Sequence, residues 1–187
     1  MMQRMQKRVE ARDIEAIFSL GCFYDNGVYG LRQNHAKALE LYKQAGELGH
    51  AAAYCKIGVS YRHGRGVEVD RNKAMHYFEL AAMAGCVAAR YNLGIIEDWG
   101  GNVDRAIKGK VDRGKVDRAI KHYMIAAKSG SHDSLINIRC LFNDGHATKD
   151  DYSKALRLYQ EYLGGIKSDQ RDEAAAFSER RYYESGV

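Results

Sequence analysis

Histidine and cysteine are the side chains in this sequence that could bind a metal or act as nucleophiles. The chain has 187 residues, with seven His and four Cys. The densest group is His132, Cys140 and His146, but its gaps of eight and six residues match no zinc module. No CxxC pair occurs, and the patterns GxxxxGKS/T, HExxH and GxSxG, which hold phosphate, zinc or a nucleophilic serine, are absent. We therefore predict no enzyme activity, no metal site and no cofactor.

The composition is that of an ordinary globular protein. Hydrophobic residues make up 45% of the chain and charged residues 28%, with a net charge of +5 and no proline. No segment has the pattern of a signal peptide, and no apolar run reaches the length of a membrane span. We therefore expect a cytoplasmic or nuclear location, reduced thiols, and packing roles for Cys55 and Cys140.

The elements that must position any functional side chain come from an internal repeat. The segment Leu20–Gly27 aligns with Ile57–Gly64, with Leu93–Gly100 and, less closely, with Ile138–Gly145. A second segment repeats as a basic residue followed by alanine, at Ala38, Ala74, Ala119 and Ala155. Four residues after each alanine stands an aromatic residue: Tyr42, Phe78, Tyr123 or Tyr159. A repeat of this period predicts a stack of similar supersecondary units.

Both segments of each unit are predicted to be helices. The second places apolar or large side chains at i, i+3, i+4 and i+7, which draws one stripe along a helix. Helix starts are predicted from the capping residues Asn34, Asp70, Asn102 and Asp151, and helix stops from Gly49, Gly85 and Gly130. In the first segment, Gly21, Gly58 and Gly94 are expected to let the two helices of a pair approach closely. Because one helix pair cannot bury its stripe alone, the pairs must stack into an all-α solenoid.

The second unit carries the fullest version of the repeat. Its pattern is Ala53-x-x-x-Ile57-Gly58-x-x-Tyr61-x-x-Gly64-x-Gly66-Val67-x-x-Asp70-x-x-Lys73-Ala74. This pattern resembles the Sel1-like repeat, a relative of the tetratricopeptide repeat with a longer loop between its helices. The resemblance implies a right-handed α/α solenoid of four such repeats and a role as a protein interaction scaffold or adaptor.

A second resemblance concerns the order of the segments. It is similar to that of proteins in which a RING-type zinc finger precedes Sel1-like repeats, although no zinc ligands of such a finger are present here. The alternative function that this resemblance implies is the substrate-binding half of a RING-type ubiquitin ligase.

The repeat pattern divides the chain into three parts. Residues 1–12 are expected to be a basic N-terminal extension, residues 13–167 the solenoid, and residues 168–187 a C-terminal capping helix and tail. The predicted repeats cover residues 13–50, 51–86, 87–131 and 132–167.

The third repeat contains a tandem duplication. Val103–Lys108 reappears thirteen residues later as Val116–Lys121. Thirteen residues turn a helix by about 220° beyond whole turns, so the two copies cannot both face the core. We therefore predict that residues 103–115 leave the solenoid as a solvated loop or short turn. This insert has a net charge of +3, which leaves nucleic-acid binding as a further alternative, although it contains no aromatic residue for base stacking.

The predicted partner site is a concave groove lined by the first helix of each pair. The stripe next to the packing positions varies in chemistry between repeats, and we expect it to face this groove; its residues are Phe18, Cys22, Asp25, Asn26, Val59, Arg62, His63, Tyr91, Ile95, Asp98, Trp99, Asn143 and Asp144. Trp99, the single Trp, is expected to anchor a peptide, with Arg62 as a charged fork; the alternative is that Trp99 covers a neighbouring helix or the insert. We expect a protein partner, and neither a membrane nor a nucleic acid.

Overall fold

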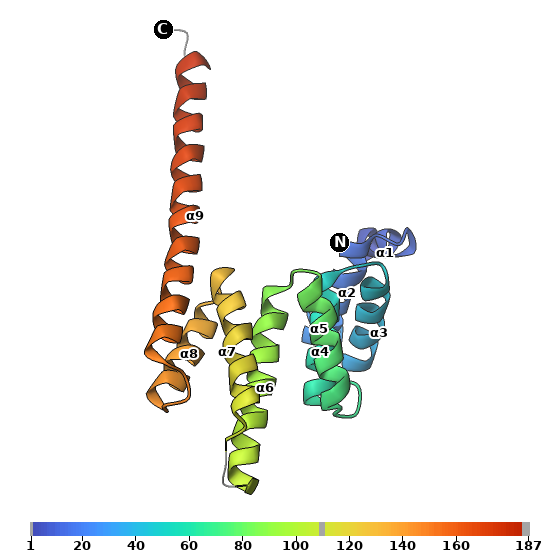
Figure 1. The fold of residues 1–187 in the computed structure, drawn as a ribbon. Helices are drawn as coiled ribbons and strands as arrows, with labels where there is room; N and C mark the ends of the chain where they lie inside the picture. Colours follow the sequence, from blue (N-terminus) through green and yellow to red (C-terminus); the bar gives the residue numbers. More distant parts are fainter. Residues whose placement is uncertain (1, 109–110, 185–187) are drawn as a thin grey trace. The chain divides into compact units, whose positions relative to one another are not determined.

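The structure is a computed structural model, which describes the backbone of residues 2–108 and 111–184 and the side chains of residues 2–99 and 111–170. Within these ranges all regular secondary structure is helical (Figure 1). The helices are α1 (Met2–Glu10), α2 (Ile14–Asn26), α3 (His35–Glu47), α4 (Ala51–His63), α5 (Arg71–Met83), α6 (Val87–Lys108), α7 (Arg113–Lys128), α8 (His132–Asn143) and α9 (Lys149–Glu184). The predicted all-α fold is confirmed.

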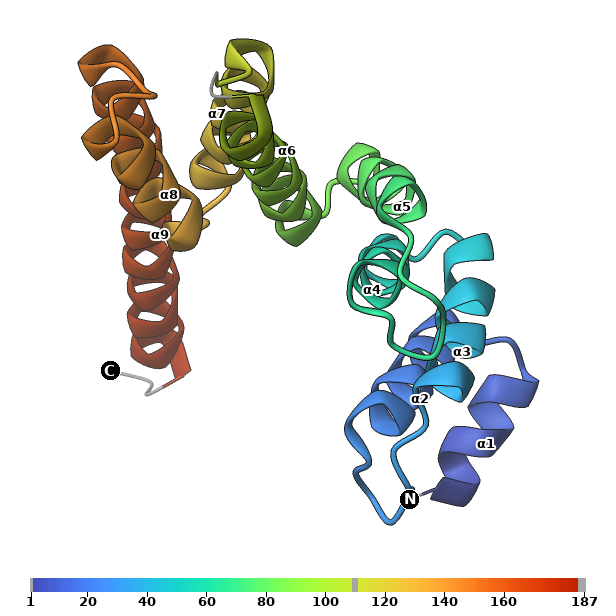
Figure 2. The same cartoon turned by 90° about the horizontal axis from the view of Figure 1, so that it is seen from below.

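The chain divides into two compact units, residues 1–96 and 97–187, with the boundary inside α6. In the first unit, α1 lies against α2, and successive helices pack together from α2 to α5 (Figures 1 and 2). In the second unit, α7 packs against α8 and α9, which also pack against each other.

Each unit is held together by the predicted stripes of small and aromatic side chains. Ala38, Leu41, Tyr42 and Ala45 on α3 are all buried, as are Ala74 and Phe78 on α5 and Ala119 and Tyr123 on α7. Gly21 faces the ring of Tyr42 and Gly58 faces the ring of Phe78; a Cβ at either glycine would come within 2.8 Å of that ring. The expected close approach within the first two helix pairs is confirmed, because the missing side chain leaves the space that each ring fills.

The helix starts follow the prediction in two of four cases. Asn34 and Asp70 each accept a backbone N–H at 2.9 Å, from Lys37 and Lys73, and so cap α3 and α5. The prediction is wrong for Asn102, which lies inside α6. Asp151 does not occupy the cap position either, because α9 begins three residues earlier than predicted. Thr148 and Asp151 bond each other's backbone N–H reciprocally there, at 3.1 and 2.9 Å. The predicted glycine stops are confirmed, since Gly49, Gly85 and Gly130 have left-handed backbones.

The duplicated segment differs from the predicted loop. α6 continues through Val103–Lys108 and α7 already begins at Arg113, while residues 109–110 lie outside the described part of the chain. The side chain of Asp112 accepts the N–H of Lys115 at 3.3 Å, which starts α7 before the second copy. That second copy supplies the buried side chains Val116, Ala119 and Ile120. Gly100 does not end α6, because a glycine within a helix costs only about 1 kcal/mol and no proline follows it.

The C-terminal end of the chain also differs from the prediction, whereas the N-terminal extension is helical. Residues 168–184 are no separate capping helix, because α9 runs without a break from Lys149 to Glu184. At the other end, the expected basic extension contains α1, whose Met2, Met5 and Val9 pack against the core of the first unit. Arg8 on α1 also bonds Asp13 at 2.8 Å, so this helix is tied to the start of α2.

Candidate functional site

The predicted groove residues of α2 are mostly used within the first unit. Asp25 is buried; its carboxylate lies 2.8 Å from Nδ1 of His35 and accepts the hydroxyl of Tyr42 at 3.4 Å. The same hydroxyl lies 3.6 Å from Sγ of Cys22, and burial together with this thiol and the Asp25 charge raises the pKa of Tyr42. Phe18 stacks on the ring of His50 with centroids 4.1 Å apart. Of this group, only Asn26 is exposed.

Some of the predicted groove residues of α4 are likewise used within the first unit, and one is exposed. Arg62 is half-buried, and its guanidinium donates a hydrogen bond of 2.9 Å to the side chain of Asn92 on α6. This bond ties the two helices together, so Arg62 serves within the first unit as well as at its surface. Val59 packs against the core, whereas His63 is exposed at the end of α4. The loss of some solvent around its ring and the charges of Arg62 and Arg65 lower the pKa of His63.

α6 carries groove residues in both units. Tyr91 and Ile95 are half-buried in the first unit, whereas Asp98 and Trp99 belong to the second. Trp99 is 64% exposed, so the described residues do not cover its ring. Asp98 is half-buried, and burial raises its pKa.

The end of α8 completes the predicted set in the second unit. Asn143 and Asp144 are both exposed there. The charge of Asp144 reinforces the raised pKa of Asp98, whereas His146 opposes it. Asp98 and Asp144, predicted from different repeats, are therefore electrostatic neighbours.

Four of the predicted residues occupy equivalent positions in the four repeats and are all exposed. We call them the helix-end row: Asn26, His63, Trp99 and Asp144. They offer an amide, an imidazole, an indole and a carboxylate. The position is thus open to solvent in every repeat, while its chemistry differs each time.

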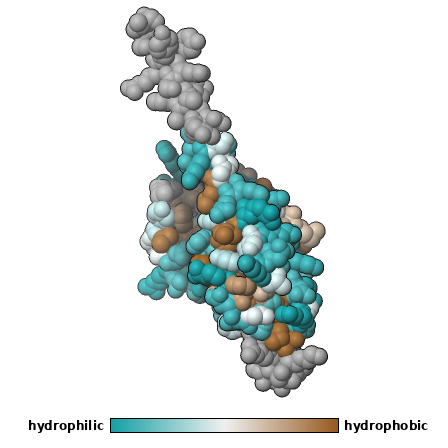
Figure 3. All heavy atoms as spheres, turned by 60° about the vertical axis from the view of Figure 1, so that its left-hand side comes forward, coloured by the Kyte–Doolittle hydropathy of each residue, from teal (hydrophilic) through white to brown (hydrophobic). Residues whose placement is uncertain are grey.

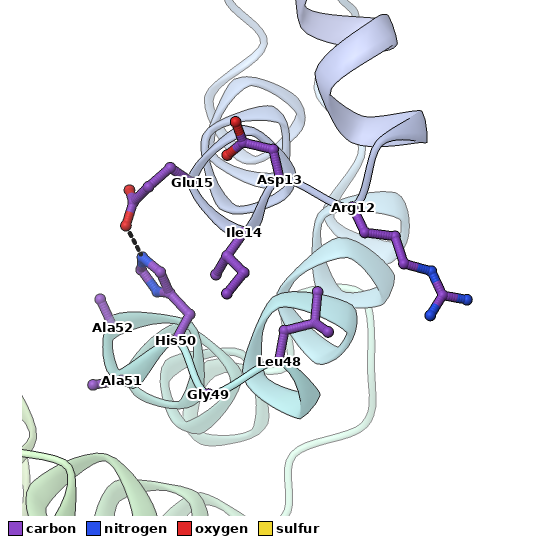
Figure 4. Close-up of a pocket in the computed structure, with 9 residues that line it drawn as sticks. All are labelled: Arg12, Asp13, Ile14, Glu15, Leu48, Gly49, His50, Ala51 and Ala52. Carbon is purple, nitrogen blue, oxygen red and sulfur yellow. Dashed lines mark ion pairs between the residues drawn. The ribbon is translucent and has the colours of Figure 1, made fainter.

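An open depression of about 790 Å³ lies at the starts of α2 and α4 in the first unit (Figure 4). It is lined by Arg12, Asp13, Ile14, Glu15, Leu48, Gly49, His50, Ala51 and Ala52. Ile14 and Leu48 point into it, whereas Arg12 points away (Figure 4). The sequence reasoning missed this site, although the signal was present: Asp13 and His50 stand at equivalent helix starts.

His50 links the depression to the core of the first unit. Its Nδ1 accepts the N–H of Ala53 at 3.1 Å, so we assign the ring proton to Nε2, which faces Glu15 at 3.3 Å. Both ring nitrogens are engaged. His50 is therefore not placed to act as a general base for a neighbouring nucleophile.

A pair of cysteines was also missed by the sequence reasoning. Cys86 occupies the position just before α6 that His50 occupies before α4, and it packs against the buried cluster to which Cys55 belongs. The neighbouring Cys86 and burial raise the pKa of Cys55, whereas Cys55 and the N–H groups of Ala89 and Ala88 lower the pKa of Cys86 to about 6. The expected packing role of Cys55 is confirmed, since it is 8% exposed in the core. Cys140 is exposed instead.

The second unit has a smaller pocket of about 300 Å³ on α7 and α9. Its charged lining residues are Asp117, Lys121, Asp150, Asp151 and Lys154, so both signs of charge are present. Nearby, the guanidinium of Arg113 from the predicted insert donates a hydrogen bond to the backbone oxygen of His146 at 3.2 Å.

The described residues offer neither a metal cluster nor a membrane-spanning helix. In that part of the chain, no three His, Cys, Asp or Glu side chains gather closely enough to hold a metal ion. Nor does any helix described there have the length and apolar character needed to cross a membrane. The cytoplasmic or nuclear location stays a prediction.

The helix pairs and their loops correspond to a known repeat. The model of the Sel1 repeat matches residues 14–50, 51–86, 87–131 and 140–161, which together make up most of the chain. The chain belongs to the Sel1 repeat family. Sel1 repeat proteins are generally protein interaction scaffolds, and their repeat is typically non-enzymatic.

Curated relatives of this Sel1 repeat protein differ in what they do. Chitin synthase regulatory factor 3 from Schizosaccharomyces pombe is 34% identical over 82 residues, which cover 44% of this chain and 9% of that protein. The ERAD-associated E3 ubiquitin-protein ligase component HRD3B from Arabidopsis thaliana is 34% identical over 108 residues, covering 57% of this chain and 17% of that protein. The Sel1 repeat protein therefore spans less than a fifth of the length of either relative.

A solved structure supports the fold. The crystal structure of a Sel1 repeat protein from Oxalobacter formigenes superposes with a TM-score of 0.68 at 26% sequence identity, covering 86% of this chain and 62% of that one. The Sel1 repeat protein thus shares its helix-pair solenoid architecture with a protein of the same family.

Proposed function

We propose that this Sel1 repeat protein is a non-enzymatic adaptor that binds a segment of a partner protein through Trp99 and Asp144, the members of the helix-end row in its second unit. The observation that carries the proposal is the contrast within each repeat. The alanines at 38, 74, 119 and 155 are at most 1% exposed in all four repeats, whereas Asn26, His63, Trp99 and Asp144 are all exposed and all different. Packing in the core explains why the buried residues are alike, and recognition of a partner explains why the exposed residues differ.

Trp99 is the expected anchor of this surface. An indole that is 64% exposed can bury a large area against a partner at low entropic cost, and Trp is enriched among interface hot spots. Arg62 is a weaker candidate than the sequence suggested, because its guanidinium already bonds Asn92. Hydrophobic residues otherwise form small separate patches on the face drawn in Figure 3, which supports recognition by a few anchors rather than by a broad apolar interface.

Changing Trp99 to Ala tests this proposal. We expect the dissociation constant for a partner isolated by affinity capture to rise by roughly 30-fold, which corresponds to about 2 kcal/mol. Titration calorimetry measures the affinity, and circular dichroism should show unchanged helicity because the ring is exposed. Met83→Ala is the matched control, since Met83 is 80% exposed but lies outside the helix-end row. Equal binding by Trp99→Ala and the wild type would exclude Trp99 as the anchor.

A second candidate follows from the similarity to HRD3B. That similarity extends over 57% of this chain, and it supports a ubiquitin ligase component as the partner. The immobilised chain should then retain a ligase that transfers ubiquitin in vitro, and Trp99→Ala should retain less of it. Capture of a partner without any ubiquitin transfer would leave the general adaptor and remove this narrower version.

A further inference from the structure

α1 ends in the same way as the second helix of a repeat. After α3, the N–H groups of Leu48–His50 bond carbonyls that lie four, three and five residues earlier. The same three bonds follow α1 at Ala11–Asp13 and α5 at Ala84–Cys86. Arg12 has a positive φ of 57° at the position where the other two turns have glycine. α1 therefore corresponds to the last part of a second helix, like α3 and α5.

This correspondence places residues of α1 at positions that are buried in a complete helix pair. Counted back from the shared turn, Arg4 corresponds to Leu41, Met5 to Tyr42 and Arg8 to Ala45. The three residues of α3 are at most 6% exposed, and Gly21 of the paired helix α2 lies against two of them. Arg4 and Arg8 are exposed instead, and Met5 is half-buried. We call Arg4, Met5 and Arg8 the α1 face.

The chemistry of the α1 face differs from that of the corresponding face of α3. It carries two guanidinium groups, and Arg8 already bonds the carboxylate of Asp13 at 2.8 Å. A purely apolar helix laid over these groups would bury charge without a partner, whereas carboxylates pair with guanidinium groups through two parallel hydrogen bonds. Met5 packs partly against the core, and its unbranched side chain can adapt to an apolar neighbour.

We propose that the α1 face binds an acidic amphipathic helix of a partner protein, in the manner in which α3 binds α2. The helix pairs of the chain supply the geometry, and the two arginines supply the preference for acidic residues. Figures 1 and 2 show α1 at the edge of the first unit, beside α2. This site is additional to the one proposed above, because Trp99 and Asp144 belong to the second unit.

A peptide with the sequence of residues 13–26 is the probe, because it reproduces the first helix of a complete pair. It contains three acidic residues and no Lys or Arg, and it includes Gly21, which lies against α3 in the folded chain. The peptide carries Cys22→Ser and a fluorescent label, and fluorescence anisotropy measures its binding to the full chain. We expect saturable binding with a dissociation constant below about 1 mM, which weakens as salt is added.

Two variants of the chain locate the site. Arg4→Glu should weaken peptide binding by roughly tenfold or more, because it reverses a charge of the α1 face. Lys7→Glu is the matched control: it makes the same change of charge on the same helix, but Lys7 corresponds to the exposed Gln44 and lies outside the α1 face. Circular dichroism should show unchanged helicity for both, since both side chains are exposed. Trp99→Ala should bind the peptide as the wild type does.

The requirement for acidic residues is tested in the peptide itself. A version with Asn and Gln in place of its three acidic residues should bind roughly tenfold more weakly or less. Equal binding of the two peptides would overturn the proposal, as would the absence of saturable binding. Equal weakening by Arg4→Glu and Lys7→Glu would also overturn it, because general attraction rather than the α1 face would then hold the peptide.

Sedimentation of the chain alone distinguishes a partner protein from a second copy. We expect a monomer in the wild type. A dimer that Arg4→Glu dissociates would show that another copy of the chain covers the α1 face, and the assignment to a partner protein would then be wrong.

Discussion

At the scale of single residues, close packing of the core requires glycine, which has no side chain, at two positions. Gly21 and Gly58 each leave the space into which an aromatic ring from the paired helix fits. Phe78 is fully buried, so its ring has nowhere to move if a methyl group appears at position 58. Asp25 shows the converse case, in which a charged side chain is buried and its carboxylate is bonded by His35 and Tyr42.

Gly58→Ala should therefore destabilise the protein. The new Cβ would lie 2.8 Å from two carbons of the Phe78 ring, and overpacking of this kind costs about 1–3 kcal/mol. Urea unfolding followed by circular dichroism measures the free energy of unfolding.

The matched control is Gly164→Ala on α9, where nothing lies within 4 Å of the new Cβ. That change should stabilise the helix by about 0.5–1 kcal/mol, because alanine loses less backbone entropy than glycine. Stabilisation by both substitutions would show that the space beside Phe78 is not filled.

At the scale of helices, the short-range contacts of a capping residue decide where a helix starts. The position of this capping residue differs between the repeats. Asn34 and Asp70 cap α3 and α5 at equivalent positions, one without a charge and one with it. In the third repeat Asp112 takes over as the cap, and Arg118, the counterpart of Lys73, instead bonds Glu97 on α6 through two N–H groups at 2.9 and 3.0 Å. The duplication thus altered where α7 begins without removing the cap itself.

The charge of Asp70 should make the start of α5 sensitive to acid. The N–H of Lys73, followed by its side chain, lowers the pKa of Asp70 below the ordinary value of about 3.9. A lowered pKa means that the folded state holds its proton less tightly than the unfolded state. The stabilisation is therefore present above pH 3.9 and is lost as the pH falls through the folded value.

Asp70→Asn keeps an oxygen acceptor at the cap but removes this titration. The free energy of unfolding of the variant should fall less between pH 5 and pH 3 than that of the wild type, as measured by urea unfolding at each pH. Asn34→Asp makes the reverse change at the equivalent position of α3 and should steepen the fall. Parallel curves for all three proteins would mean that the cap charges do not contribute to acid sensitivity.

At the scale of the whole molecule, stability should be distributed by unit and by neighbouring repeat. Each unit has its own packed helices, and in a solenoid each repeat is stabilised by its immediate neighbours. A local defect is then expected to loosen nearby helices far more than distant ones.

Hydrogen exchange in Gly58→Ala tests this distribution. Amides of α4 and α5, which pack on each other, should exchange faster than in the wild type, because the defect lies between them. Amides of α8 in the second unit should keep their rates. Uniform acceleration throughout the chain would instead indicate that both units unfold in a single cooperative step.

The sequence by itself determined the features that depend on local periodicity. The repeat predicted paired helices, and the stripe of Ala38, Leu41, Tyr42 and Ala45 identified the buried face of α3 correctly. The glycine stops and the caps at Asn34 and Asp70 were also predictable, because each acts on a backbone group within a few residues.

Only the tertiary structure decided the features that join distant residues or set one local signal against another. The hydrogen bond between Arg62 and Asn92 requires knowing which faces of α4 and α6 meet. The continuation of α6 through Gly100 and of α9 through Gly164 could not be predicted from glycine alone, since a weak helix residue ends a helix only where another conformation is more stable. The preference of a single residue for or against a helix amounts to about 1 kcal/mol. Packing contacts contribute free energies of similar or greater magnitude, and they decide which of these preferences prevail.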